Sequence, residues 1–469
     1  MPTELSFSNR SLSGLRVLLA YVVLPNLAFW LAGHMFETLP RATVNLDYLL
    51  IAIFVPFLRR WQSVTLTAVA LLLDIARCLG PLYYFSQKDA ISAVVFLREL
   101  SFTQVFLSAL VVIVPSIALG WLLVSLGGSG AELKRNRALV VCVLVVFGSL
   151  GVWGGNSSLR FRDQAMGMNL CTSAGLSMAK TVSNAIFRKN DRVAPEVVDS
   201  ATRRAGWFET IPVDRNLILV VLESGGEPVN PKWKDLMESE WKNPELLRRY
   251  RIETGEVPFS GATVPGEFRE LCGVASGVIE RPTDNVSIMK NCLPWRFQSA
   301  GMVPQYLHGF SAAMFNRAEW VGKLGFQKEL FHPALRALGL ADCGGPFRGT
   351  CDEDVAAFIG NELVADREHR YLIAWTTLNS HLPVEADAKA SEKLKCGTGG
   401  AVVEDDASCN LIALLMKANH AVATLALRPD LPATEFVIVG DHAPPFIFKE
   451  RRERFSQERV PYIHLTPQP

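Results

Sequence analysis

The residues most able to do chemistry are four polar side chains in three well-separated segments. Glu223 lies near the end of LVVLES, Thr263 lies within GATVPGEF, and Asp441 and His442 close VIVGDH. Two carboxylates, an imidazole and a hydroxyl form a mixed oxygen and nitrogen donor set that suits one divalent cation, zinc or manganese. A hydroxyl bound to such an ion loses its proton near neutral pH. The set therefore predicts a metal site in which Thr263 is an activated nucleophile.

Each of these residues also has a simpler structural explanation. Glu223 suits a solvated position or the neighbourhood of a helix cap, and Asp441 follows a glycine in a pattern that is typical of turns. Pro265 is accepted in a first helical turn, so a helix is expected to begin at Pro265, and the hydroxyl of Thr263 would then lie beside amides that can receive an anion. The local sequence alone favours Thr263 as a plain N-cap. Joint placement, rather than any single residue, supports the metal site.

The elements that must position these residues are buried strands. The segments 216–222, 371–377 and 436–439 are continuous apolar runs, as expected for strands that are covered on both faces in a mainly parallel sheet. Glu223 follows the first run, His381 lies just beyond the second, and Asp441 and His442 follow the third. Sites in open α/β sheets form beyond the carboxyl ends of the strands. Helices are expected between the strands, at 352–365 and 410–427.

The first 155 residues have a different character. The chain has 469 residues, is 49% hydrophobic and has a formal net charge of +1, so no charge excess points to nucleic acid. A membrane-spanning helix needs about 20 mostly apolar residues. Five spans are predicted, at about 17–36, 44–58, 64–85, 102–124 and 138–155. The second is short and contains Asp47, so a re-entrant or interfacial segment is its alternative.

Basic residues in the short loops predict the orientation of these spans. Every second loop is basic. The basic residues are Arg10 and Arg16 before the first span, Arg59 and Arg60 after the second, and Lys134, Arg135 and Arg137 between the fourth and fifth. This pattern places the N-terminus in the cytoplasm and the chain after about residue 155 outside. The resulting organisation is a five-helix transmembrane domain (1–156), juxtamembrane connecting helices (157–210) and an extracytoplasmic catalytic domain (211–469).

The cysteines of the polar domain agree with an external location. Six of them form three groups of two that are close in sequence: Cys272 and Cys292, Cys343 and Cys351, Cys396 and Cys409. No CxxC spacing supports a zinc site. Two or three disulfides are therefore expected in an oxidising compartment, with their connectivity left open.

Five motifs in this order resemble a known family: LVVLES, GATVPGEF, HGFSAAMFNR, TTLNSHLPV and GDHAPP. Together with the preceding spans they resemble lipoteichoic acid synthases and the related phosphoethanolamine transferases of the alkaline phosphatase/sulfatase superfamily. The resemblance implies an alkaline-phosphatase-like α/β domain. It implies Glu223, Thr263, Asp441 and His442 as metal ligands, with Thr263 also the nucleophile.

The resemblance extends to the substrate side of the site. It implies Arg317 as a phosphate clamp, which suits the bidentate geometry of arginine, with Asn316 and Phe315 beside it. His308 and His381 would bind substrate or act as acid and base. Phe315 stands where the synthases have tryptophan, so the headgroup stays open.

The implied function is a metal-dependent transferase of the bacterial inner membrane with a periplasmic catalytic domain. It would move phosphoethanolamine or phosphoglycerol from a membrane phospholipid, through a phosphothreonine, to a surface glycan or glycolipid. A phosphodiesterase or other hydrolase of the same superfamily and a non-catalytic envelope scaffold are the alternatives. The metal, the acceptor and the oligomeric state stay undefined.

Overall fold

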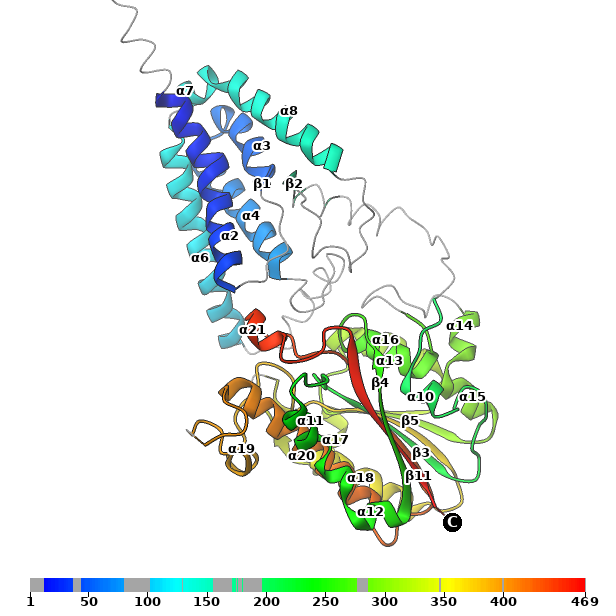
Figure 1. Ribbon diagram of the computed structural model, residues 1–469. Coiled ribbons are helices and arrows are strands. Elements are labelled where there is room, and N and C mark those ends of the chain that lie inside the picture. Colours follow the sequence, from blue (N-terminus) through cyan, green and yellow to red (C-terminus); the bar gives the residue numbers. More distant parts are fainter. Residues whose placement is uncertain are drawn as a thin grey trace, which may run out of the picture. The chain divides into compact units, whose positions relative to one another are not determined.

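The computed structural model describes residues 12–36, 44–79, 102–128, 130–154, 171–173, 175, 179, 196–275, 286–345, 347–398 and 400–468. The chain forms two compact units, Met1–Asp191 and Arg192–Pro469 (Figure 1). The first is helical and the second is built around a β-sheet.

The described part of the first unit consists mainly of apolar helices. These are a π-helical turn η1 (Leu19–Val23), α2 (Leu24–Phe36), α3 (Asp47–Phe54), η2 (Val55–Phe57), α4 (Arg60–Leu79), α6 (Phe102–Leu126), α7 (Gly130–Arg135) and α8 (Arg137–Gly154). Helix α6 carries Pro115 in its interior. Two short strands, β1 (Val44–Asn45) and β2 (Cys171–Thr172), pair in parallel.

Two stretches of the first unit, Leu12–Leu31 and Ala109–Leu126, are long and apolar enough to cross a membrane, among the residues described. They match the first and fourth predicted spans. The predicted second span holds β1, α3 with eight residues, and the short η2, which continues α3 to Phe57. This helical run is shorter than the roughly 20 residues that a hydrocarbon core needs, so both the span and the re-entrant or interfacial alternative stay predictions.

The other membrane predictions are covered in part. In sequence, helix α4 overlaps the third predicted span and α8 overlaps the fifth. Residues 80–85 of the third span lie outside the described part of the chain. Much of the segment 157–210, where connecting helices are expected, also lies outside it. The five-span topology therefore stays a prediction.

Several buried polar groups of the first unit bond to one another. The backbone N–H of Asn45 donates to Asn26 Oδ1 at 2.8 Å, and the Tyr48 hydroxyl donates to Asp74 Oδ2 at 3.0 Å. Asp47 accepts the hydroxyl of Ser173 and the backbone N–H of Gly175. A buried carboxyl group is costly unless it is bonded, and these bonds explain how Asp47 is tolerated among apolar helices.

The second unit contains a seven-stranded mixed sheet, counted over the described residues, with strand order β4-β11-β10-β3-β9-β5-β6. The strands are β3 (Asn216–Leu222), β4 (Tyr250–Pro258), β5 (Val303–His308), β6 (Lys328–Phe331), β9 (Tyr371–Thr376), β10 (Thr434–Gly440) and β11 (Arg459–Pro467). The five strands from β10 to β6 are parallel, and β11 and β4 extend that array with antiparallel pairs. The three predicted strands are β3, β9 and β10, so an α/β domain with a parallel central array is confirmed.

The register of these strands brings the predicted site residues together. Leu222 pairs with Gly440, and Val221 pairs with both Val439 and Thr376. The residues that follow β3, β9 and β10 therefore leave the sheet at one edge, as expected for parallel strands.

Helices cover both faces of the sheet. Successive residues of β3 point to opposite faces: Leu217, Leu219 and Val221 join one core with α13 and α15, and Ile218, Val220 and Leu222 join the other with α18 and α20. The helices of this unit are α10 (Ala201–Arg204), α11 (Pro231–Met237), η4 (Ser239–Lys242), α12 (Pro244–Arg249), α13 (Thr263–Cys272), α14 (Val286–Asn291), α15 (Leu293–Ser299), η6 (Met314–Asn316), α16 (Arg317–Trp320), η7 (Gly322–Leu324), α17 (His332–Ala337), α18 (Asp352–Ala365), α19 (Ala388–Leu394), α20 (Asp406–Ala426) and α21 (Lys449–Arg452). Helices α18 and α20 match the predicted ones.

Helix α20 is also long and apolar enough to cross a membrane by composition. Most of its side chains are buried against α18, α19 and the sheet, so it is a core helix of this unit. The described residues form three disulfides, Cys272–Cys292, Cys343–Cys351 and Cys396–Cys409, which confirms the expected local pairs. The bridge Cys343–Cys351 lies beside a short hairpin of β7 (Asp342–Cys343) and β8 (Gly349–Thr350). The bridge Cys396–Cys409 joins the segment after α19 to α20.

Candidate active site

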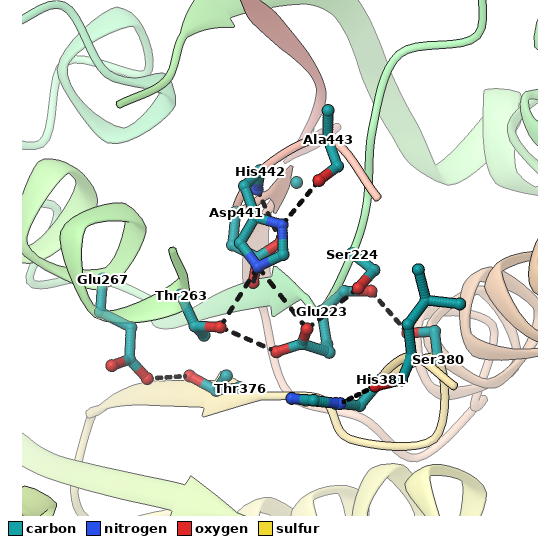
Figure 2. Close-up of polar contacts among 12 residues, drawn as sticks. Glu223, Ser224, Thr263, Glu267, Thr376, Ser380, His381, Asp441, His442 and Ala443 are labelled. Atoms are coloured by element: carbon teal, nitrogen blue, oxygen red, sulfur yellow. Dashed lines mark hydrogen bonds and ion pairs between the residues drawn. The ribbon is translucent and has the colours of Figure 1, made fainter. Parts of the chain in front are cut away.

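Thr263, Glu223, Asp441 and His442 meet beyond the carboxyl ends of β3 and β10 (Figure 2). One donor atom from each of Glu223, Asp441 and His442 lies within 4.8 Å of the others. The Thr263 hydroxyl donates to Glu223 Oε2 at 2.9 Å and lies 3.5 Å from His442 Nε2. Thr263 is 2% exposed, whereas the nearby Ser260 is exposed. The predicted nucleophile therefore contacts two of the three predicted carboxylate and imidazole ligands.

Close backbone contacts set this geometry. A Cβ on Gly440 would lie 1.8 Å from the carbonyl oxygen of Gly225, so the turns after β3 and β10 can approach only because glycine occupies this position. Thr263 is the first residue of α13, two residues earlier than Pro265, where the sequence predicted the helix to start. A Cβ on Gly266 would lie 3.1 Å from the Asp441 Cα, so α13 packs its first turn directly on the Asp441 backbone.

The donor set fits a divalent cation. The Nδ1 of His442 lies 2.9 Å from the carbonyl oxygen of Ala443. Because a carbonyl only accepts, this nitrogen carries the hydrogen, and Nε2 presents its lone pair toward Glu223 and Asp441, at 3.7 and 3.3 Å. Asp441 Oδ2 is buried without a hydrogen-bond donor. An unsatisfied buried carboxylate oxygen is costly unless a cation compensates it.

The charges at this site compete with one another. Burial raises the pKa of Asp441 well above its usual value, and the carboxylate of Glu223 raises it further. Burial also acts to raise the pKa of Glu223, but the histidines His381 and His442 and two hydroxyl donors outweigh it, so this pKa is lowered. Burial lowers the pKa of His442, which keeps its imidazole neutral. A neutral imidazole beside two carboxylates is the protonation state that metal binding requires.

His381 and His308 lie at the ends of neighbouring strands. His381 Nδ1 bonds the carbonyl of Leu382 at 2.8 Å, and its ring lies 3.9 Å from that of Phe347. His308 Nδ1 bonds the carbonyl of Thr376 at 3.0 Å, and its buried Nε2 has no hydrogen-bond partner. Burial lowers the pKa of both histidines, and the positive charge of Arg317 lowers them further. Both are neutral acceptors through Nε2.

Arg317 is placed differently from a free phosphate clamp. It is 1% exposed, and its guanidinium donates to Glu267 Oε1 at 3.2 Å and to the Tyr306 hydroxyl at 2.9 Å. Phe315 and Asn316 precede it in the left-handed region, with φ of 55° and 53°, a conformation that is strained for such residues. Among the described residues no hydrogen bond joins these three to Thr263 or to the predicted ligands, so the clamp role stays a prediction.

Several residues that were not predicted hold the predicted ones in place. The Ser380 hydroxyl donates to the carbonyl of Glu223 at 2.6 Å, and the Thr377 hydroxyl accepts its N–H at 2.9 Å. Ser224 donates to Glu223 Oε1 at 3.0 Å. Ser380 and Thr377 both lie in TTLNSHLPV, which carries the resemblance, but their role became visible only from the pairing of β9 with β3.

Three buried charged residues of α13 were missed as well. Arg269 donates to the backbone carbonyls of Gly440 and Asp441, at 2.7 and 3.3 Å, and so holds the turn that carries the ligands. Its charge is balanced by Glu270 at 2.6 Å. Glu267 accepts from Tyr306, Thr376 and Arg317. One signal of this role is present in the sequence: charged residues recur in a segment that also carries apolar core residues.

Comparisons with known proteins place these findings in context. No family model matches the chain, and no curated protein matches it either. Solved structures do. A lipoteichoic acid synthase, LtaP, from Listeria monocytogenes is 15% identical over 54% of this chain and 65% of its own, with a TM-score of 0.40. The motif resemblance named the same family.

Two further structures give similar values. The phosphoglycerol transferase GacH from Streptococcus pyogenes, in complex with sn-glycerol-1-phosphate, is 16% identical over 59% of this chain and 76% of its own, with a TM-score of 0.38. The C-terminal periplasmic domain of EcEptC from Escherichia coli, in complex with zinc, is 13% identical over 55% and 74%, with a TM-score of 0.38. This chain spans less than two thirds of the Listeria protein. At such values the similarities identify no substrate, and the functional conclusion rests on the site geometry.

Proposed function

We propose that the protein is a metal-dependent transferase that moves a phospho-headgroup from a membrane phospholipid to a surface glycan or glycolipid through a phosphothreonine at Thr263. The headgroup is phosphoethanolamine or phosphoglycerol. One observation carries the proposal: the buried hydroxyl of Thr263 lies against Glu223 and His442, in a donor set that also includes Asp441. A plain N-cap threonine does not need such neighbours.

In the first half-reaction the Thr263 oxygen attacks the phosphorus of the headgroup. The new bond joins Thr263 Oγ1 to phosphorus, and the bond from phosphorus to the diacylglycerol oxygen breaks. Glu223 Oε2, which already accepts the hydroxyl hydrogen at 2.9 Å, takes the proton. A proton then passes to the diacylglycerol oxygen, so that diacylglycerol leaves as a neutral alcohol. A divalent zinc or manganese ion held by Glu223, Asp441 and His442 would lower the pKa of the hydroxyl and stabilise the developing negative charge.

In the second half-reaction a hydroxyl of the acceptor attacks the phosphothreonine. The bond from Thr263 to phosphorus breaks, the threonine oxygen recovers a proton, and the acceptor carries the headgroup away. His308 and His381 have lowered pKa values and unprotonated Nε2 atoms, so either is suited to take the proton of an incoming hydroxyl. Arg317 would stabilise the phosphoryl oxygens.

The membrane part of the proposal follows from the first unit and the cysteines. The apolar helices α2 and α6 would hold the enzyme in the bacterial cytoplasmic membrane, close to its lipid donor, which raises the effective concentration of that donor. The three disulfides of the second unit favour an oxidising compartment, consistent with a periplasmic catalytic domain.

A phosphodiesterase with the same first half-reaction is the alternative that the geometry also allows. Water would then replace the glycan hydroxyl, and the free headgroup would be released. Incubating the protein with phospholipid, with and without a glycan acceptor, separates the two, because only a transferase attaches the headgroup to the acceptor. A scaffold would form no adduct in either case.

Mass spectrometry of the Thr263 peptide tests the proposal directly. After incubation of the metal-loaded protein with mixed phospholipids, we expect a headgroup adduct on Thr263, and its mass identifies phosphoethanolamine or phosphoglycerol. Thr263→Ala should form no adduct and transfer no headgroup while remaining folded. Ser260→Ala is the matched control, an exposed hydroxyl three residues earlier, and should label normally. Transfer at the wild-type rate by Thr263→Ala would reject the proposal.

A further inference from the structure

One oxygen of Glu267 accepts three hydrogen bonds. The hydroxyls of Tyr306 and Thr376 each donate to Glu267 Oε1 at 2.6 Å, and Arg317 Nη2 donates to it at 3.2 Å. Figure 2 shows the contact with Thr376 beside the Thr263 site. None of these four side chains is more than 1% exposed. The donors come from β5, β9 and α16, so a single carboxylate of α13 joins three elements at the edge where the site forms.

The orientation of Arg317 is fixed by this network. Its Nε donates to the Tyr306 hydroxyl at 2.9 Å, Nη2 donates to Glu267, and Nη1 donates to the carbonyl of Met314 at 3.4 Å. Arginine has five N–H donors. Within the described part of the chain three are used, which leaves one on each Nη. One N–H from each Nη is enough for a guanidinium to bind a phosphoryl group bidentately.

Fixing a guanidinium in this way has an energetic consequence. An arginine side chain on its own samples many rotamers, and ordering it on binding costs affinity. A buried arginine without a counter-ion would in addition be strongly unfavourable. Glu267 balances the charge and holds the plane of the guanidinium before any ligand arrives, so the cost of ordering is not incurred at binding.

We propose that Glu267 is a positioning residue that holds the Arg317 guanidinium in the orientation that receives the phosphoryl group of the substrate. Glu267 acts through Arg317 and does not touch the substrate. Tyr306 supports the same orientation through the Nε of Arg317, and Thr376 holds the carboxylate. This inference rests on the proposed function, in which Arg317 contacts the phosphoryl group.

Binding of inorganic phosphate to the metal-loaded full-length protein in detergent tests the inference. We expect Glu267→Gln to keep the fold and the metal content and to weaken phosphate binding about tenfold or more, the loss typical of a hydrogen bond to a charged group. Arg317→Ala should weaken binding at least as much. The double variant should bind no more weakly than Arg317→Ala alone, because Glu267 has no effect without Arg317.

Glu435→Gln is the matched control. Glu435 is also a buried carboxylate with three donors, bonding Trp207 and His464 at 2.8 Å and Arg215 at 3.4 Å. It lies near the start of β10, at the opposite end of that strand from Asp441. Loss of a buried carboxylate there should lower stability without changing phosphate affinity. A general structural effect would instead weaken phosphate binding in both variants.

Tyr306→Phe provides a second test in case the Glu267→Gln variant fails to fold. It removes one donor to Glu267 and the partner of Arg317 Nε without removing a charge, and should weaken phosphate binding in the same direction. Wild-type phosphate affinity in the folded Glu267→Gln variant would overturn this inference and leave the proposed function standing. If Glu267→Gln does not fold, wild-type affinity in Tyr306→Phe would do the same. An additive loss in the double variant would also overturn the inference. A metal-loaded wild-type protein that binds no phosphate removes the proposed function and the inference together.

Discussion

At the scale of single residues, the three histidines near the candidate site make the same kind of hydrogen bond. Each Nδ1 bonds a backbone carbonyl, that of Ala443 for His442, Leu382 for His381 and Thr376 for His308. This fixes the tautomer and leaves Nε2 as the acceptor. A metal ligand and two candidate acid–base groups are thereby set to the neutral form that their roles need, and burial lowers the pKa of each.

His308 gives a test of this arrangement by pH. Its folded-state pKa lies well below the ordinary value of about 6.5, first because of burial and then because of Arg317. The unfolded chain therefore binds a proton near pH 6.5 that the folded protein does not bind, so stability rises with pH through that window and is lost as pH falls below about 6.5. We predict that His308→Gln reduces this slope by up to about 1.4 kcal/mol per pH unit.

Thermal unfolding of metal-free protein at several pH values between about 5 and 7.5 measures the effect. His420→Gln is the control, because His420 is exposed on α20 and pairs with Glu240 at 3.1 Å. It should leave most of the slope in place. An unchanged slope in His308→Gln would show that His308 is protonated in the folded protein, contrary to its burial beside Arg317.

The sequence predicted the residues that meet at the site better than the residues that hold them. Glu223, Asp441 and His442 each follow a buried apolar run, and that pattern is local. The role of Glu267 depends on Tyr306 and Thr376, which lie 39 and 109 residues away. The side chain of Arg317 was predicted to face phosphate, but its pairing with a buried carboxylate has no local signature. Partners so distant in sequence become visible only with the sheet order.

At the scale of elements, the candidate site depends on the strand register and on the start of α13. The apolar runs predicted β3, β9 and β10, because strands covered on both faces are uniformly apolar. Strand β4 was missed, since most of its residues are partly or fully exposed and its sequence, YRIETGEVP, is largely polar. Its antiparallel partner β11 was missed too. The two antiparallel strands lie at one side of the sheet, so their omission did not affect the site.

Gly266 tests the packing of α13 on the ligand turn. A Cβ there would lie 3.1 Å from both Cα and Cβ of Asp441 and 3.2 Å from its carbonyl oxygen. Alanine would favour the helix by up to about 1 kcal/mol, but overpacking against backbone costs about 1–3 kcal/mol. The clash should therefore prevail, and we predict that Gly266→Ala weakens metal binding by displacing Asp441.

Metal affinity and melting temperature, measured for Gly266→Ala beside Gly400→Ala, check this prediction. A Cβ on Gly400 meets nothing within 4 Å, so that variant should match the wild type. Wild-type metal affinity in Gly266→Ala would mean that the close packing at Gly266 does not set the position of Asp441. The turn would then be held by Arg269 of the same helix, through the carbonyls of Gly440 and Asp441.

At the scale of the whole molecule, composition predicted two parts of different character, and the chain forms two compact units. The apolar segments predicted where helices lie in the first unit better than which of them cross a membrane. Hydropathy measures only apolar content and does not indicate where a helix ends. In the second predicted span, α3 ends after Phe54. Hydropathy also marks α20, which burial assigns to the core of the second unit.

The cysteines show how sequence spacing and structure combine. Local pairs were predicted because each two cysteines lie close in the chain, and all three disulfides join such neighbours. Cys272 ends α13 and Cys292 precedes α15, so one bridge ties the helix that begins at Thr263 to the next layer of the core. An oxidising compartment would thus stabilise the same helix that presents the proposed nucleophile.

Anomalous X-ray diffraction from the full-length protein crystallised with zinc or manganese tests the proposed metal site most directly. We predict one anomalous peak about 2.0–2.3 Å from an oxygen of Glu223, an oxygen of Asp441 and Nε2 of His442, with the Thr263 hydroxyl completing the ligand set. Metal-loaded crystals whose only peaks lie away from these residues would contradict the claim that they form one cation site around the Thr263 hydroxyl.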